Sequence, residues 1–129
     1  MNVSTVMDQI GTRLATITGL RVFSFAAENA QPPFAMVDYP ESVEYDSTMS
    51  RGSDEAVFRV LVGVARNIDR SARKALDDYL DGSGSKSIKA AIEAGTVGHS
   101  ARVRRATVSE IVVADTPFVG AVFEVHVIA

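Results

Sequence analysis

The sequence predicts a single α+β domain over residues 1–129, with helices packed on a largely antiparallel or mixed β-sheet and a long protruding loop or β-arm. Two observations lead to this prediction. Apolar residues follow helical or strand spacing in successive segments, in the order α-β-β-arm-β-α-α-β-β. The chain also has the length and composition of one folded unit, because its 129 residues are 47% hydrophobic and 22% charged.

The N-terminal third predicts one helix and two short strands. Apolar residues in segment 3–18 recur at alternating spacings of three and four, which is typical of a helix that covers a core. Asn2 is a candidate N-cap and Gly19 a candidate C′ residue for this helix. Strands are expected at 20–26 and 34–39.

The segment 41–55 differs from its surroundings, because it is acidic and has few apolar residues. One base and five acids give it a net charge of 1 − 5 = −4. It cannot bury much of its own surface, so we expect an exposed loop or two-stranded arm that contacts a partner. Its predicted contact residues are Glu41, Glu44, Tyr45, Asp46, Met49, Arg51, Asp54 and Glu55.

The remaining elements follow from periodicity and turn residues. Segment 56–65 is apolar at both alternating sets of positions, which predicts a strand in the middle of the sheet. Asp69 is a candidate N-cap for a helix through Asp81, and a shorter helix is expected at 86–94. The C-terminal segment predicts a hairpin, with strands at 103–114 and 118–128 around a turn at 115–117.

The sequence contains no pattern that predicts catalysis or cofactor binding. There is no cysteine, which excludes disulfides, thiolate metal sites and a cysteine nucleophile. Glu124 and His126 could supply two metal ligands, but a zinc site normally needs three or four. The segment 82–87 departs from the phosphate-loop spacing and follows a predicted helix instead of a strand. We therefore expect no enzyme activity, no cofactor and no metal.

Basic residues cluster twice, although the net charge is only −3. One cluster surrounds the start of the second helix, and the other lies on the penultimate strand at Arg102, Arg104 and Arg105. No aromatic residues interleave with the second cluster, so it does not predict a stacking platform for nucleic acid. Charges of both signs in separate places favour association of identical copies, and these three arginines are predicted to contact acidic residues of an adjacent copy.

Several segments together resemble a known family. They are Arg21–Phe23, Pro32–Val37, Val57–Val64 and, above all, Ala75–Glu93 with its Leu-Asp-Asp-Tyr-Leu-Asp-Gly-Ser-Gly-Ser-Lys-Ser-Ile-Lys sequence. In order and spacing they are similar to tail terminator and tail-completion proteins of bacteriophages with long non-contractile tails. The likeness extends over almost the whole chain.

The resemblance implies a structural virion protein, which is not an enzyme. Such proteins form a ring, usually a hexamer, at the head-proximal end of the tail tube, where the ring stops tube growth and joins the tail to the head connector. The implied partners are further copies of the chain, the major tail tube protein and a head–tail connector or head-closure protein. Genomic DNA would pass through the lumen without specific binding, and no membrane is involved.

Two other interpretations remain open at the level of the sequence. Another head–tail joining or head-closure ring protein would share the size, the fold class and the lack of catalysis. A small ligand-binding or hydrolase-like α+β domain is the more distant alternative. A deep pocket with converging titratable groups would favour that second possibility.

Overall fold

A computed structural model describes residues 1–24, 31–46, 52–67, 69–113 and 115–129. The elements are α1 (Val3–Leu14), β1 (Arg21–Phe23), β2 (Phe34–Asp38), β3 (Val43–Glu44), β4 (Glu55–Ala65), α2 (Arg70–Leu80), α3 (Ile88–Glu93), β5 (Ser100–Val113) and β6 (Thr116–Ile128). This order confirms the predicted α+β fold.

The strands form one mixed sheet in the order β1-β2-β4-β6-β5, and β3 pairs with the start of β4. Within the described ranges, β1 and β2 are the one parallel pair, while the other pairs are antiparallel. Strand β4 lies between β2 and β6, as its two apolar faces predicted. Strand β5 occupies an edge of the sheet.

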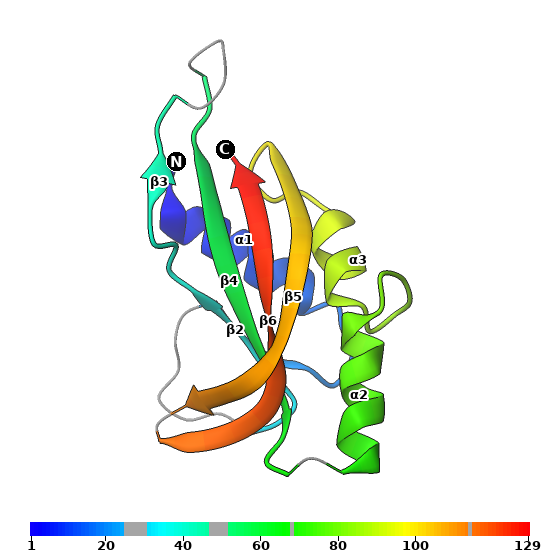
Figure 1. Cartoon of the computed structure of the whole chain (residues 1–129). Coiled ribbons are helices and arrows are strands. Elements are labelled where there is room, and N and C mark those ends of the chain that lie inside the picture. Colours follow the sequence, from blue (N-terminus) through cyan, green and yellow to red (C-terminus); the bar gives the residue numbers. More distant parts are fainter. Residues whose placement is uncertain (25–30, 47–51, 68, 114) are drawn as a thin grey trace.

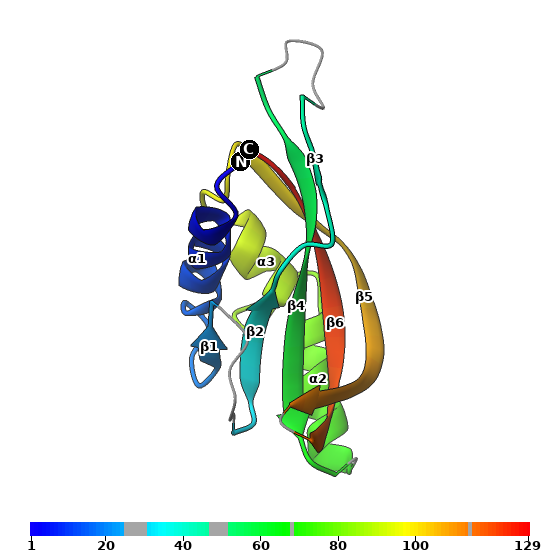
Figure 2. The same cartoon turned by 90° about the vertical axis from the view of Figure 1, so that its left-hand side faces the viewer.

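The helices cover one face of this sheet, where the main core lies (Figures 1 and 2). Alternate residues of β4 and β6 point into that core, because successive side chains of a strand face opposite sides. Phe58, Val60, Phe123 and Val125 are each at most 2% exposed. Leu76 and Tyr79 of α2 and Ile88 and Ile92 of α3 belong to the same core cluster. We call the opposite face the open face, because no helix of the described residues lies on it (Figure 2).

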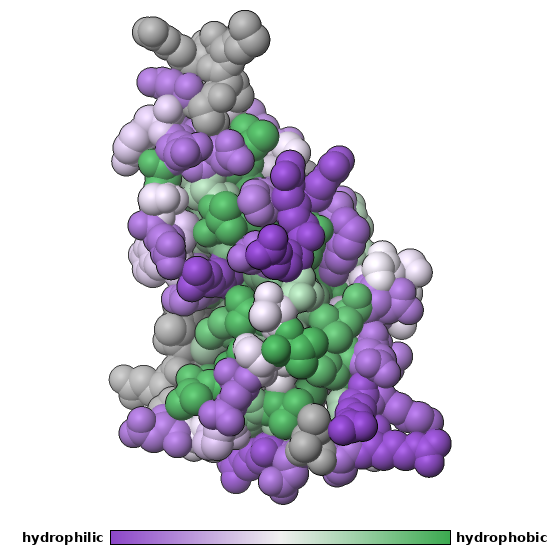
Figure 3. All heavy atoms as spheres, in the orientation of Figure 1, coloured by the Kyte–Doolittle hydropathy of each residue, from purple (hydrophilic) through white to green (hydrophobic). Residues whose placement is uncertain are grey.

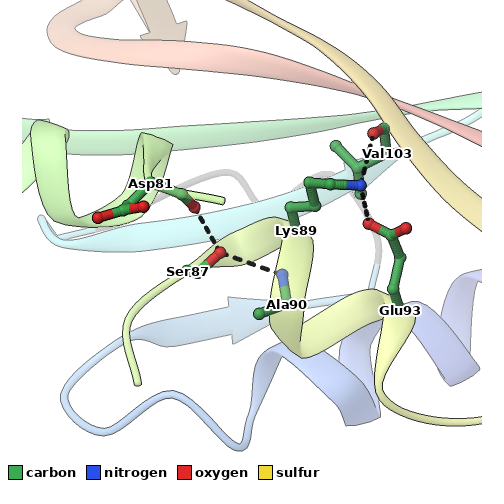
Figure 4. Close-up of polar contacts among 6 residues, drawn as sticks. All are labelled: Asp81, Ser87, Lys89, Ala90, Glu93 and Val103. Atoms are coloured by element: carbon green, nitrogen blue, oxygen red, sulfur yellow. Dashed lines mark hydrogen bonds and ion pairs between the residues drawn. The ribbon is translucent and has the colours of Figure 1, made fainter. Parts of the chain in front are cut away.

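Side-chain caps start the three described helices, two of them at the positions that the sequence indicated. The third helix spans Ile88–Glu93 and not the predicted 86–94. The Asn2 side chain accepts a hydrogen bond from the Thr5 N–H at 3.0 Å, and Asp69 accepts one from the Ala72 N–H at 2.8 Å. Ser87, only 1% exposed, caps α3 by accepting from the Ala90 N–H at 3.1 Å. Its hydroxyl also donates to the Asp81 carbonyl at 2.5 Å, which ties the end of α2 to the start of α3 (Figure 4).

A second, smaller core lies on the open face, where the β5–β6 hairpin bends over the sheet (Figure 2). It consists of Phe34, Met36, Ile111, Val113 and Phe118. The rings of Phe34 and Phe118 meet edge to face, with 5.0 Å between their centroids. Close packing here needs glycine at position 63, because a Cβ on Gly63 would lie 2.5 Å from the Phe34 ring.

Several predicted boundaries were wrong, including the start of the penultimate strand, which lies at Ser100 and not at residue 103. The first helix ends at Leu14 and not at residue 18, so Gly19 is not its C′ residue. The chain continues in turns instead: the Thr16 hydroxyl donates to the Arg13 carbonyl at 2.7 Å, and Ile17 is still buried. The strand expected at 20–26 spans only Arg21–Phe23, and residues 25–30 lie outside the described residues.

The predicted turn at 115–117 is also shorter than expected, because Thr116 and Pro117 belong to β6. Proline has no N–H to give to a sheet, so it is normally excluded from a central strand. At Pro117, however, β6 pairs only with β5, since its pairing with β4 extends only as far as Val119. The turn itself includes Asp115, whose φ is +64°.

Candidate functional site

The described part of the acidic segment forms the two-stranded base of a β-arm at one end of the sheet, which was one of the two predicted alternatives (Figure 2). Val43 pairs with Ala56, and Glu44 pairs with Glu55, so the base of the arm is two-stranded. Directly opposed carboxylates repel each other, and a nearby cation would reduce the repulsion between Glu44 and Glu55. The predicted contact residues Glu41, Glu44, Tyr45 and Asp46 are exposed, whereas Met49 and Arg51 lie outside the described residues.

Asp54 holds the base of the arm in place. Its carboxylate forms an ion pair with the N-terminal amine of Met1 and accepts a hydrogen bond from the Asp46 N–H at 3.1 Å. Both contacts keep the pKa of the Asp54 carboxyl below its ordinary value, and the amine has the larger effect. Its backbone exchanges two hydrogen bonds with Ala129, at 2.7 and 2.9 Å. Asp54 therefore orients the arm relative to both chain termini.

A row of alternating charges crosses the open face below the arm. Arg105 of β5 lies opposite Glu124 of β6, which lies opposite Arg59 of β4, and Arg59 lies opposite Asp38 of β2. The Arg105 Nε is 4.0 Å from a Glu124 carboxylate oxygen, and Arg59 also reaches Glu41 of the arm at 3.0 Å. Exposed pairs of this kind add little stability, but opposite charges in register favour this strand pairing over others.

The open face is hollowed between the arm and this row. A groove of about 380 Å³ is lined by Glu41, Glu44, Glu55, Glu124 and His126, among others. Arg102 pairs with His126 on the far side of the groove. The structure thus places the predicted arm acids and two of the predicted arginines, Arg102 and Arg105, at opposite margins of one face.

Arg104 is the third predicted arginine, and it lies at a β-bulge between Val103 and Arg105. All three arginines are exposed. The Lys89 ammonium forms an ion pair with Glu93 and contacts the Val103 carbonyl at 3.4 Å, which occupies a hydrogen-bond acceptor of the edge strand (Figure 4). A bulge and basic side chains are common means of preventing an edge strand from pairing with another chain.

The distal half of β5, residues 106–113, has neither a bulge nor a basic side chain. Its register with β6 is continuous from Arg105 to Val113, and Val108 and Val112 are 59% and 58% exposed. Hydrophilic side chains crowd the upper half of the open face in Figure 3, whereas hydrophobic ones gather lower down, over the bent hairpin. An apolar depression of about 280 Å³ lies beside this half-strand, lined by Val108, Pro117, Phe118, Val119 and Arg66, among others.

The other basic cluster lies at the end of the molecule opposite the arm (Figure 1). Arg66 directly follows β4, while the arm joins β4 at Glu55, its first residue. Arg70, Arg73 and Lys74 continue the cluster along the exposed side of α2. We call these four residues the basic end. The sequence showed both charged segments, but only the direction of β4 shows that they lie at opposite ends.

Sequence reasoning missed the charge row and the apolar depression. Arg59 was a visible signal, since it interrupts an otherwise apolar alternation in segment 56–65. Its partners Asp38 and Glu124 could not be identified, because they come from strands distant in sequence. The depression combines the end of β4 with both strands of the hairpin and has no local signature.

The described residues give two further findings about chemistry. No group of three or more His, Asp or Glu side chains among them is placed to hold a metal ion. No helix in the described part of the chain is long and apolar enough to cross a membrane.

The fold and the surface together define an α+β domain with a charged sheet face, an acidic arm at one end and a basic end at the other. Comparison with protein families and with curated proteins found no family and no relative that matches this chain.

Proposed function

We propose that this chain is a structural subunit of a phage tail, which assembles into a homo-oligomeric ring, a hexamer, at the head-proximal end of the tail tube. The ring ends tube growth and presents a surface to the head–tail connector. The proposal places the protein in the virion and gives it no catalytic role. It rests on the resemblance of the segments within 21–93 to tail terminator proteins and on the distribution of charge over the surface.

The observation that carries the proposal is the end-to-end charge polarity of the molecule. Acidic residues of the arm lie at one end of β4, and the basic end lies at the other. A molecule with complementary patches at two separate places can bind its own copies head to tail. Such a contact makes a closed ring if the rotation between copies closes, and a filament if it does not.

The size of the chain is compatible with a ring of six around DNA. A globule of 129 residues has a radius of gyration of about 14 Å, which corresponds to a sphere radius of about 18 Å. Six touching spheres leave a central hole of about 18 Å radius, which accommodates a DNA duplex, whereas four leave about 8 Å. With a charge of −3 on each chain, the ring would have little attraction for the DNA that passes through it.

The arm is the proposed contact with a neighbouring copy or with the tube. Glu44, Tyr45 and Asp46 are exposed, and Asp54 anchors the strand base that holds them. An arm that is fixed at its base and polar at its surface loses little conformational freedom on binding, which favours association.

Two measurements test the proposal. Light scattering of the purified protein should give about six times the 13.8 kDa of the chain, and negative-stain microscopy should show rings. Added to polymerising tail tube protein from the same genome, the chain should shorten the tubes and lie at one of their ends. Rings that leave tube length unchanged would instead indicate a head-closure protein, and a monomer that does not bind tubes would overturn the proposal.

A further inference from the structure

The arm and the depression cannot meet within one molecule. The arm joins β4 at Glu55, and Arg66 on the rim of the depression follows the last residue of the same strand. An extended strand of 11 residues spans about 35 Å. Because β4 is hydrogen-bonded to neighbours on both sides, it holds the two features apart.

The depression offers an apolar floor with charge at its rim. Val108, Pro117, Phe118 and Val119 supply apolar surface, and Val108 is 59% exposed. The Arg66 guanidinium lies 6.0 Å from the centre of the Phe118 ring. Glu110, also on the rim, provides an acceptor for a hydroxyl group. An aromatic side chain with a polar tip matches this combination.

The arm carries such a side chain. Tyr45 is 77% exposed, and acidic residues, Glu44 and Asp46, precede and follow it. The lining of the depression has one charge of each sign, Arg66 and Glu110. Arg70 and Arg73 at the exposed start of α2 add positive charge at the same end of the molecule. The chain therefore carries both halves of a complementary contact, and this complementarity identifies the partner as a second copy of the same chain.

We propose that the arm of one copy docks on the basic end of the next, with Tyr45 in the apolar depression and Glu44 and Asp46 facing Arg66 and Arg70. The inference rests on the proposed homo-oligomer and names the two surfaces that form it. The contact is heterologous, because two different patches meet, so each copy offers one free arm and one free depression. Tyr45 supplies most of the binding energy as a buried aromatic anchor, and the surrounding charges orient the approach.

Single substitutions on either side test the contact by sedimentation velocity. Tyr45→Ala removes the anchor, and Val108→Asp places a charge in the depression; both side chains are exposed, so the fold should be kept. Each variant should raise the dissociation constant of the oligomer by about tenfold or more. Tyr39→Ala is the matched control, since Tyr39 is also exposed, at 65%, but lies beside α1 and outside the arm. It should associate like the wild type.

A mixing experiment tests the head-to-tail geometry. Tyr45→Ala protein retains an intact depression, and Val108→Asp protein retains an intact arm. Mixed in equal amounts, the two should form a 1:1 dimer and nothing larger, because only one productive contact exists between them. A mixture that stays monomeric overturns the proposed contact, and so does a Tyr45→Ala variant that keeps the wild-type size distribution.

The two proposals fail in different ways. If Tyr45→Ala still forms rings, the arm contact is wrong while the ring itself stands. If the wild type is monomeric at every concentration and the mixed variants do not pair, the arm contact is wrong. The tube-length measurement then decides separately whether the protein still ends tail tubes.

Discussion

The two faces of the β-sheet differ in what lies against them and in what their residues do. The covered face presents Phe58, Phe123 and Val125 to three helices and buries them almost completely. The open face presents Arg59, Glu124 and Arg105 in a charged row, and no helix of the described residues covers it (Figure 2). Stability should therefore depend much more on the first face than on the second, and the following changes test that division.

The largest expected loss of stability comes from Phe123→Ala on the covered face. Phe123 is 2% exposed between helices and sheet, and truncating a buried phenylalanine costs about 3–5 kcal/mol. Urea unfolding followed by circular dichroism measures the change. Thr107→Ala, an exposed position on the adjacent strand, is the control and should stay within about 0.5 kcal/mol of the wild type. Equal effects at the two positions would contradict the division between faces.

Gly120→Ala should come next, because β4 and β6 pass very close to each other at this point. A Cβ on Gly120 would lie 1.8 Å from the Val62 carbonyl oxygen, so the strands would have to separate. Overpacking of this kind costs about 1–3 kcal/mol, sometimes more. Ala121→Gly, one residue further along β6, provides a comparison in which no atom is added. A Gly120→Ala variant as stable as the wild type would show that β4 and β6 lie further apart at this point.

Ser87→Ala should cost about 1–2 kcal/mol, because it leaves the Ala90 N–H without its cap. The substitution also removes the hydroxyl bond to the Asp81 carbonyl, so the connection between α2 and α3 should loosen. Hydrogen exchange should rise in both helices and stay unchanged in the hairpin. Ser83→Ala, in the exposed turn between the same helices, is the matched control.

Acid should weaken the arm base through Asp54. Its folded pKa lies below the ordinary value of 3.8, so its contribution is complete above that value and is lost as pH falls through the folded pKa. The melting temperature of Asp54→Asn should be lower than that of the wild type at neutral pH, and the difference should shrink below about pH 4. Asp46→Asn removes a neighbouring charge as a control. A difference independent of pH would exclude the carboxylate as the cause.

The smallest effect on stability is expected from Arg59→Ala on the open face. Arg59 is exposed, and exposed ion pairs typically contribute about 0.2–1 kcal/mol. The loss should be smaller still at high salt, because screening weakens exposed pairs. Glu41→Ala removes the other partner of the Arg59–Glu41 ion pair, so it should have the same effect as Arg59→Ala in thermal unfolding at low and at high salt.

Some elements could be predicted from the sequence because their signals are local. Asp69 caps the helix that follows it, and the apolar residues of β4 alternate on both sides, so its central position was predictable. The arm was recognised from its composition, since a segment with so few apolar residues cannot enter a core. The end of the first helix was missed, because the apolar spacing continues to Ile17, which the core buries without helical structure.

The sequence by itself determined the elements, the apolar faces, the acidic arm and the two basic clusters, because periodicity and charge are properties of neighbouring residues. Only the tertiary structure decided that Arg59, Glu124 and Arg105 form one row, since strand register is set between segments far apart in the chain. It also decided that the arm and the basic end lie at opposite ends of the molecule. The direction of one buried strand, held by hydrogen bonds on both sides, separates them.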